Sequence, residues 1–154
     1  MPLARFILLL VFAIKISIDD VRFHKIYNKD LFLFLLILLC DSILCGDLIP
    51  QMLSVLNLFA IIIPFALYGI LSTKKIGIGA GDVKLLMVLT FGFVGAQFQQ
   101  IEIYFLSLWC TLTLQMCLHY LFKRKFPSSV AMAPSIFFGL GLYLYAPTRL
   151  LLPQ

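Results

Sequence analysis

Long apolar runs, separated by short polar connections, recur along almost the whole of this chain. Six of these runs approach the roughly 20 residues that a membrane-spanning helix needs, within a tolerated range of about 17 to 25. The pattern therefore predicts an all-α, polytopic membrane protein with about six transmembrane helices. The predicted spans are Pro2–Ile18, Leu31–Cys45, Leu48–Leu71, Val83–Phe98, Ile101–Phe122 and Ser129–Leu152.

The composition favours lipid as the solvent for most of the chain. Its 154 residues are 62% hydrophobic and 12% charged, with a mean hydropathy of +1.06. A soluble domain carries about twice this share of charged residues. We therefore expect one membrane-embedded domain over residues 1–154. The first apolar run lacks a small-residue cleavage site, so we expect mature structure there rather than a removed signal.

Basic residues gather in alternate connections between the predicted helices. Ten of the twelve Lys and Arg residues lie in or beside the connections after the first, third and fifth spans, whereas the connections 45–48 and 98–100 contain none. The positive-inside rule makes the basic side cytoplasmic and directs both termini outward. The net charge of +5 is then an orientation signal, and no nucleic-acid partner is expected. Asp20 and Asp82 fall on the cytoplasmic side.

The four cysteines carry no metal signature. Cys40 and Cys45 flank a short predicted turn, and Cys110 and Cys117 lie within one apolar run. Without a CxxC pair or a histidine cluster, we expect no zinc site. The sequence leaves open whether Cys40 and Cys45 form a disulfide.

Acidic side chains at membrane depth are costly and therefore usually functional. Asp82 follows the glycine-rich segment 77–81, and its simplest role is to cap the helix that follows. Glycines at alternate positions do more than a cap requires, because they let another backbone approach closely. Asp20 belongs to a basic segment whose simplest interpretation is a solvated loop. There Arg22 can pair with Asp20 or with lipid phosphates, and Asn28 can cap the second helix.

Two carboxylates on one membrane face suggest acid–base catalysis. Close carboxylates cannot both ionise cheaply, so they share a proton and their apparent pKa values separate. The ionised member then activates water, while the neutral member protonates the developing oxyanion or the leaving amine. This is aspartic-peptidase chemistry, and it needs neither a metal nor a cofactor. The spacing of Asp20 and Asp82 in the sequence does not by itself bring them together.

Three segments resemble the type IV prepilin peptidases, a family of GxGD membrane aspartic peptidases. Residues 79–86, Gly-Ala-Gly-Asp-Val-Lys-Leu-Leu, look like the GxGD signature of that family. Residues 20–28 fit its first aspartate segment, D-x-R-x-x-x-I-x-N. Residues 133–139, Ala-Pro-Ser-Ile-Phe-Phe-Gly, resemble its Pro-then-Gly final helix. The three segments occur in family order and span most of the chain.

The resemblance implies an aspartic endopeptidase of the bacterial cytoplasmic (inner) membrane that cleaves the basic leader from type IV prepilin-like subunits on the cytoplasmic side. By motif position Asp20 and Asp82 are the expected catalytic pair, whereas Asp19 is out of register with the pattern. The expected partners are prepilin-like substrates and membrane lipids, and the oligomeric state stays open. The residues expected to bind substrate or shape the site are Gly79, Gly81, Arg22, Asn28 and Lys84.

Lys84 has two interpretations. It can lower the pKa of a nearby carboxyl group, or its long side chain can extend to the membrane interface, which we favour. The chain departs from the family pattern at Tyr27 and Ala131, where proline is common. Larger relatives carry an N-terminal region with paired cysteines and methylate the new N-terminus. This chain therefore resembles the short form, with peptidase activity alone.

Three other functional classes stay open. A proton-coupled membrane transporter would place acids along a pore, often between inverted repeats, and no such repeat is visible. A non-enzymatic subunit of pilus or secretion assembly would keep the fold without turnover. Related GxGD chemistry on another membrane substrate is the third.

Overall fold

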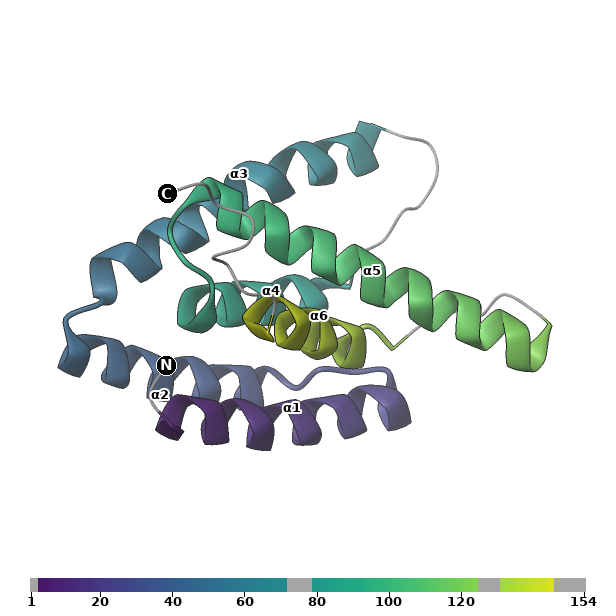
Figure 1. The fold of residues 1–154 in the computed structure, drawn as a ribbon, viewed down its shortest axis with the longest axis horizontal. Helices are drawn as coiled ribbons and strands as arrows, with labels where there is room; N and C mark the ends of the chain where they lie inside the picture. The colour runs from purple at the N-terminus through teal and green to yellow at the C-terminus, as the bar shows by residue number, and fades with distance from the viewer. Residues whose placement is uncertain (1–2, 72–78, 125–130, 146–154) are drawn as a thin grey trace.

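The computed structural model describes residues 3–71, 79–124 and 131–145, which form six helices and no strands (Figure 1). The predicted all-α class is confirmed for this part of the chain. Lys74, Lys75 and Lys125, which contribute to the predicted orientation, lie outside the described residues. The helices are α1 (Leu3–Phe23), α2 (Asn28–Cys45), α3 (Leu48–Leu71), α4 (Ala80–Phe93), α5 (Phe98–Lys123) and α6 (Ala133–Tyr145).

Several helix ends differ from the predicted ones. α3 has the predicted bounds, but α1 continues past Ile18 to Phe23, so the expected loop around Asp20 is helical. α2 starts earlier than predicted, α4 is shifted toward the N-terminus, and the described part of the last helix begins at Ala133. The apolar pattern marks where a helix leaves the predicted lipid, and polar residues can continue the same helix.

α5 is the one described helix that is long and apolar enough to cross a membrane, with a mean hydropathy of 1.5 over Phe98–Phe122. Leu48–Ile63 and Ala133–Tyr145 are shorter apolar helices in the same comparison. α4 has 14 residues. At a rise of 1.5 Å per residue it is about 21 Å long, less than the roughly 30 Å of a hydrocarbon core. Several membrane crossings therefore stay a prediction.

α1 and α2 form an antiparallel pair that is joined by two ion pairs. Arg5 binds Asp41 near one end of the pair, and Lys15 binds Asp30 near the other. Arg5 and Lys15 are nearly as far apart along α1 as Asp30 and Asp41 are along α2, so the antiparallel helices can form both ion pairs together. Between them, one phenylalanine from each helix stacks with ring centroids 4.5 Å apart.

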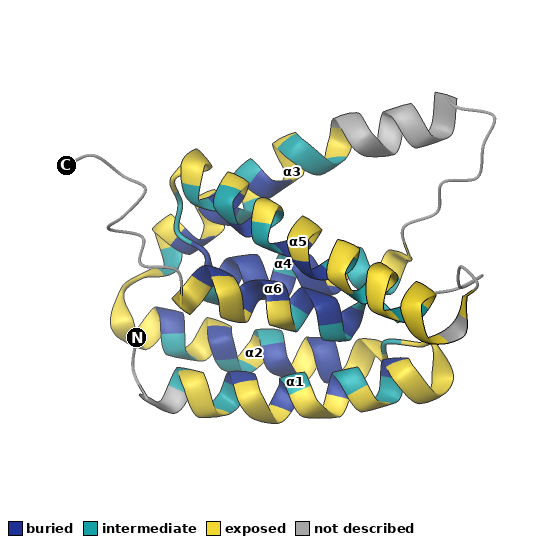
Figure 2. Ribbon diagram, turned by 45° about the vertical axis from the view of Figure 1, so that its right-hand side comes forward, coloured by how far each residue is buried: buried dark blue, intermediate teal, exposed yellow. Residues whose placement is uncertain are grey.

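α4 is the central helix of the bundle. Most side chains between Leu85 and Gly92 are buried, and α4 contacts α2, α3 and α6. Leu38 of α2 packs so closely on Gly92 that a Cβ added there would lie 2.7 Å from a Leu38 methyl carbon. Figure 2 shows the buried residues gathered between the α1–α2 pair and α4 with α6. The first turn of α4 is thereby held at one end of the bundle.

α5 and α6 are antiparallel and joined by side chains of α5 spaced one turn apart. Each of these donates a hydrogen bond to a backbone carbonyl in or just before α6, which is a common way of joining membrane helices. The pairs are Ser107 with Gly139, Thr111 with Ser135 and Gln115 with Ala131, at 2.7, 3.0 and 3.2 Å. A Cβ added at Gly139 would lie 2.9 Å from Leu108 Cα, so only glycine permits this approach. These bonds hold α6 alongside α5 from its first turn onward.

Candidate active site

Asp20 lies near the end of α1 and is only 6% exposed. Its Oδ2 accepts a hydrogen bond of 2.9 Å from the backbone N–H of Ala133, the first residue of α6. The first N–H groups of a helix have no partner within it, and the helix dipole places partial positive charge there. The start of α6 therefore offers Asp20 a donor and a favourable environment for negative charge.

Asp19, the neighbouring acid, has different surroundings. It is half-buried and lies near Lys15, one turn earlier on the same face of α1. Consecutive residues of a helix point about 100° apart, so the side chain of Asp19 leaves α1 in another direction from that of Asp20. Of these two acids, the contact with α6 belongs to Asp20.

Asp82 lies in the first turn of α4, just before the predicted span that starts at Val83. The helix begins at Ala80 with Gly79 as its N-cap residue, so the interpretation of Asp82 as the N-cap residue is wrong. The carboxyl group instead turns back over Gly79, whose N–H donates to it. A Cβ on Gly79 would lie 2.7 Å from Asp82 Oδ2, so this glycine makes room for the carboxyl group itself.

Asp82 holds its proton more tightly than an ordinary aspartic acid. Burial, followed by the negative charge of Asp20, raises the pKa of Asp82 from 3.8 to about 6, against an opposing effect of the Gly79 N–H. The two carboxyl groups are therefore electrostatically coupled. Within the described residues neither of them forms an ion pair, unlike Asp30 and Asp41. The site thus has one acid in an environment suited to charge and one that keeps its proton up to about pH 6.

Gly81 lies against the connection between α1 and α2. A Cβ added to Gly81 would lie 3.1 Å from the Cβ of Ile26, closer than most such contacts. The two motif glycines therefore serve packing within the chain: one accommodates the Asp82 carboxyl group and the other accommodates Ile26. These glycines are also predicted to admit the backbone of a substrate strand, and this stays a prediction.

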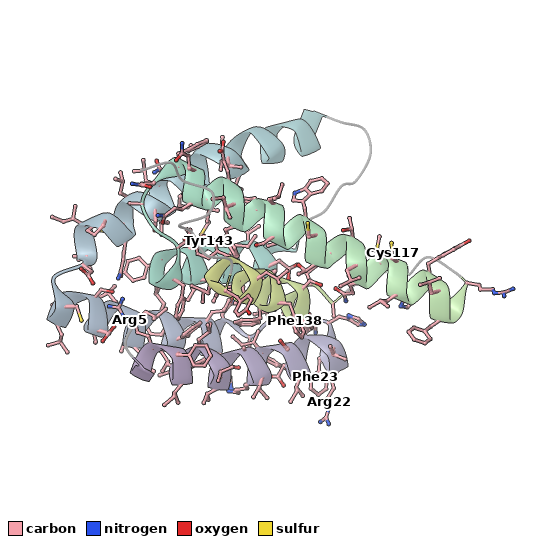
Figure 3. The ribbon with its side chains drawn as sticks, in the orientation of Figure 1. Arg5, Arg22, Phe23, Cys117, Phe138 and Tyr143 are labelled. Carbon is pink, nitrogen blue, oxygen red and sulfur yellow. The ribbon has the colours of Figure 1, made fainter. Side chains whose placement is uncertain are left out.

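Arg22 does not join the two acids. It is exposed near the end of α1, points away from the helices (Figure 3), and forms no ion pair with any described residue. The alternative in which Arg22 pairs with Asp20 is therefore wrong for this structure. An exposed position at this end of α1 leaves its guanidinium group accessible from outside the bundle.

Asn28 and Lys84 contact each other across α2 and α4. The N-cap residue of α2 is Tyr27 rather than Asn28, so the predicted cap is wrong. Asn28 Oδ1 instead accepts a hydrogen bond of 3.0 Å from Lys84 Nζ. Residues two apart on a helix do not share a face, so Lys84 points to a different side of α4 from Asp82. Lys84 therefore does not lie between the two carboxyl groups.

The three family-like segments meet at one end of the bundle. Asp20 binds the first residue of the 133–139 segment, and the 20–28 segment contacts the 79–86 segment through two pairs of residues. The resemblance of residues 133–139 to the family gave no sign that Ala133 supplies an N–H to Asp20. A scan against protein-family models and searches of curated proteins and solved structures give no match to this chain.

The described residues contain no group of three or more His, Cys, Asp or Glu side chains that could hold a metal ion. The four cysteines, Cys40, Cys45, Cys110 and Cys117, are free and exposed. The chemistry available at this end of the bundle is therefore that of two coupled carboxyl groups, a helix N-terminus and an exposed basic surface.

Proposed function

We propose that this chain is a membrane aspartic endopeptidase that removes the basic leader of type IV prepilin-like subunits at the cytoplasmic face. The observation that carries the proposal is that Asp20 and Asp82, from segments far apart in the sequence, lie close enough for the charge of Asp20 to raise the pKa of Asp82. Both belong to segments that resemble the same family, and the third such segment contacts Asp20 through Ala133. An arrangement of this kind suits a catalytic pair better than solvated loop acids.

The surroundings of the two acids suggest different roles. Asp20, at the N-terminus of α6, is the base that takes a proton from water as the water attacks the scissile carbonyl carbon. Asp82 is the acid that gives its proton to the carbonyl oxygen, which forms a neutral tetrahedral intermediate. A proton then passes from Asp20 to the leaving amine while Asp82 recovers a proton from the collapsing intermediate. Such acid–base steps typically contribute about 10²- to 10⁴-fold to a rate.

The proposal includes several membrane-spanning helices. Large apolar side chains are exposed along the described helices, among them Leu44 at 86%, Ile49 at 81% and Phe122 at 86%. A soluble monomer rarely exposes so much apolar surface, whereas lipid covers it at no cost. At the end that holds Asp20 and Asp82, Arg22 and Lys25 are exposed, as a cytoplasmic face requires.

Two forces would hold the substrate. Its basic leader stays among cytoplasmic phosphates and acids, while its apolar helix lies against helices of the enzyme within lipid. Glycine before the scissile bond, as the resemblance implies, allows an extended backbone to enter the site.

Cleavage of a prepilin-like substrate by purified protein in detergent or lipid tests the proposal. We expect Asp20→Asn and Asp82→Asn to abolish cleavage, while Asp19→Asn, the matched control on the same helix, retains it. Loss in Asp19→Asn with Asp20→Asn active would move the base by one residue. If the wild type cleaves no such substrate while the same substitutions change a proton flux, the chain is a transporter instead.

A further inference from the structure

An apolar groove with a volume of about 550 Å³ lies between α2, α3 and α4. Its walls are one face of α2 from Asn28 to Leu39 and one face of α4 from Lys84 to Phe91, with two residues of α3. The single charged group lining it is Lys84, at the same end as Asn28. The groove is therefore amphipathic, with one cationic end and an apolar remainder.

This groove is separate from the two aspartates. Neither Asp20 nor Asp82 lines it. Lys84 is two residues after Asp82 in α4, a spacing that places the two side chains on different faces of the helix. A molecule in the groove thus lies beside the candidate active site rather than in it.

The length of the groove suits a molecule that occupies one leaflet of a bilayer. From Asn28 to Leu39 the α2 wall extends about 16 Å at 1.5 Å per residue. This is close to half of the roughly 30 Å hydrocarbon core, whereas a spanning helix needs the full thickness. An acyl chain of a lipid has the matching extent, and the two methionines that line the groove, Met52 and Met87, adapt to a flexible apolar chain.

Charge at the groove end selects the head group. The Lys84 ammonium has three N–H donors, of which Asn28 accepts one, and the other two have no acceptor among the described residues. Lys29 is exposed in the first turn of α2, next to Asn28, and no acid lines the groove. A basic leader peptide would be repelled here, whereas a phosphate would be attracted, and basic pockets between helices at the cytoplasmic face are known to suit anionic head groups.

We propose that the α2–α3–α4 groove binds an anionic glycerophospholipid, with its phosphate at Lys84 and one acyl chain along α2 and α4. The inference rests on the membrane placement proposed above and does not depend on the peptidase chemistry. It assigns Lys84 a role in binding lipid and leaves the two aspartates to the reaction.

The test uses the full chain in phosphatidylcholine vesicles that contain chain-spin-labelled phosphatidylglycerol or, in parallel, chain-spin-labelled phosphatidylcholine. Electron paramagnetic resonance gives the motionally restricted fraction of each label. We expect a preference for phosphatidylglycerol that Lys84→Gln lowers about five-fold, the effect of one basic residue near a membrane surface. Lys25→Gln, an exposed residue that does not line the groove, is the matched control and should change the preference less.

A second pair of variants tests the apolar part. Leu35→Trp fills the groove and should reduce the restricted phosphatidylglycerol, whereas Leu36→Trp, on an exposed neighbouring residue outside the groove, should not. Equal effects within both pairs would overturn the proposal, as would failure of the chain to insert into the vesicles. Loss of prepilin binding in Leu35→Trp with unchanged lipid binding would assign the groove to the substrate. Lipid binding without any cleavage would contradict the peptidase proposal alone.

Discussion

Aspartates at the two ends of the bundle differ in whether they have a cationic partner. At the end marked by Arg5 (Figure 3), Asp41 accepts from that guanidinium group, and Asp47 lies 3.9 Å from Arg5 Nη2. At the other end Asp20 and Asp82 lie near each other, and neither has a cationic partner among the described residues. Paired acids hold helices together at modest cost, whereas two coupled acids without a cation raise the free energy of the folded state.

Lys15 and Asp30 sharpen this contrast, because they form an ion pair toward the same end of α1 as the two aspartates. A cation is therefore present nearby, yet it binds Asp30 and not Asp20. The energetic cost falls on Asp82, whose pKa is raised by burial and by the charge of Asp20. Such a cost is typical of a functional site.

The largest expected effect is on kcat/KM, and it distinguishes a catalytic aspartate from one that stabilises the fold. Asp20→Asn should lower kcat/KM for a prepilin-like substrate by about 10²- to 10⁴-fold with little change in Tm. Asp41→Asn should instead lower the free energy of unfolding by about 1–3 kcal/mol, because Arg5 loses its closest acceptor, while kcat/KM stays near the wild-type value. Cleavage kinetics and thermal unfolding in one detergent measure both. A similar loss of kcat/KM in the two variants would remove the distinction between the ends.

The next prediction concerns the contact that positions Ala133. Gly139→Ala should destabilise the fold by about 1–3 kcal/mol, because the new methyl group meets the α5 backbone at Leu108. It should also lower cleavage, since α6 must move away from α5 and carries Ala133 with it. Thermal unfolding and cleavage kinetics measure the two effects.

Gly141→Ala on the same helix is the matched control, because nothing lies within 4 Å of a Cβ added there. It should stabilise the protein by about 0.5–1 kcal/mol through the higher helix propensity of alanine. Equal behaviour of the two variants would show that close packing of α5 on α6 does not position the site.

A smaller effect is expected in the pH dependence of stability. The folded-state pKa of Asp82, about 6, exceeds its ordinary value of 3.8, so the folded protein binds this proton more tightly than the unfolded chain. Ionisation of Asp82 therefore favours unfolding as the pH rises from about 4 to about 6. Asp82→Asn should remove this loss and be more stable than the wild type at pH 7, with a smaller difference at pH 4. Thermal unfolding across this pH range provides the measurement, and parallel curves for both proteins would contradict the prediction.

Local pattern was enough to predict the helical class, whereas the choice of Asp20 and Asp82 as the candidate site came from the resemblance of their segments to a known family. The bounds of α3 follow from its uninterrupted apolar run, and Asp20 and Asp82 follow from motif segments that keep their internal spacing. The end of α1 could not be predicted in this way, because its last turn contains polar residues that a pattern of apolar positions assigns to a loop. Apolar periodicity carries no signal for such a continuation.

The sequence could not predict the contacts between distant segments. Nothing near Asp20 indicates that its partner is the N–H of Ala133, and nothing near Gly79 indicates that its missing side chain accommodates the Asp82 carboxyl group. Arg22 illustrates the opposite error, because proximity in sequence suggested a pairing that the direction of its side chain rules out. Tertiary packing decides such partners, since several candidates have the right chemistry.

The most direct test of the central claim is the pKa of Asp82 in the wild type and in Asp20→Asn. Infrared or ¹³C NMR titration of the labelled carboxyl group measures it without a substrate. We expect a wild-type pKa of about 6 that falls in Asp20→Asn yet stays above 3.8, because burial is the larger cause and is retained. An unchanged pKa in Asp20→Asn would show that the two carboxyl groups are not coupled and would contradict a catalytic pair.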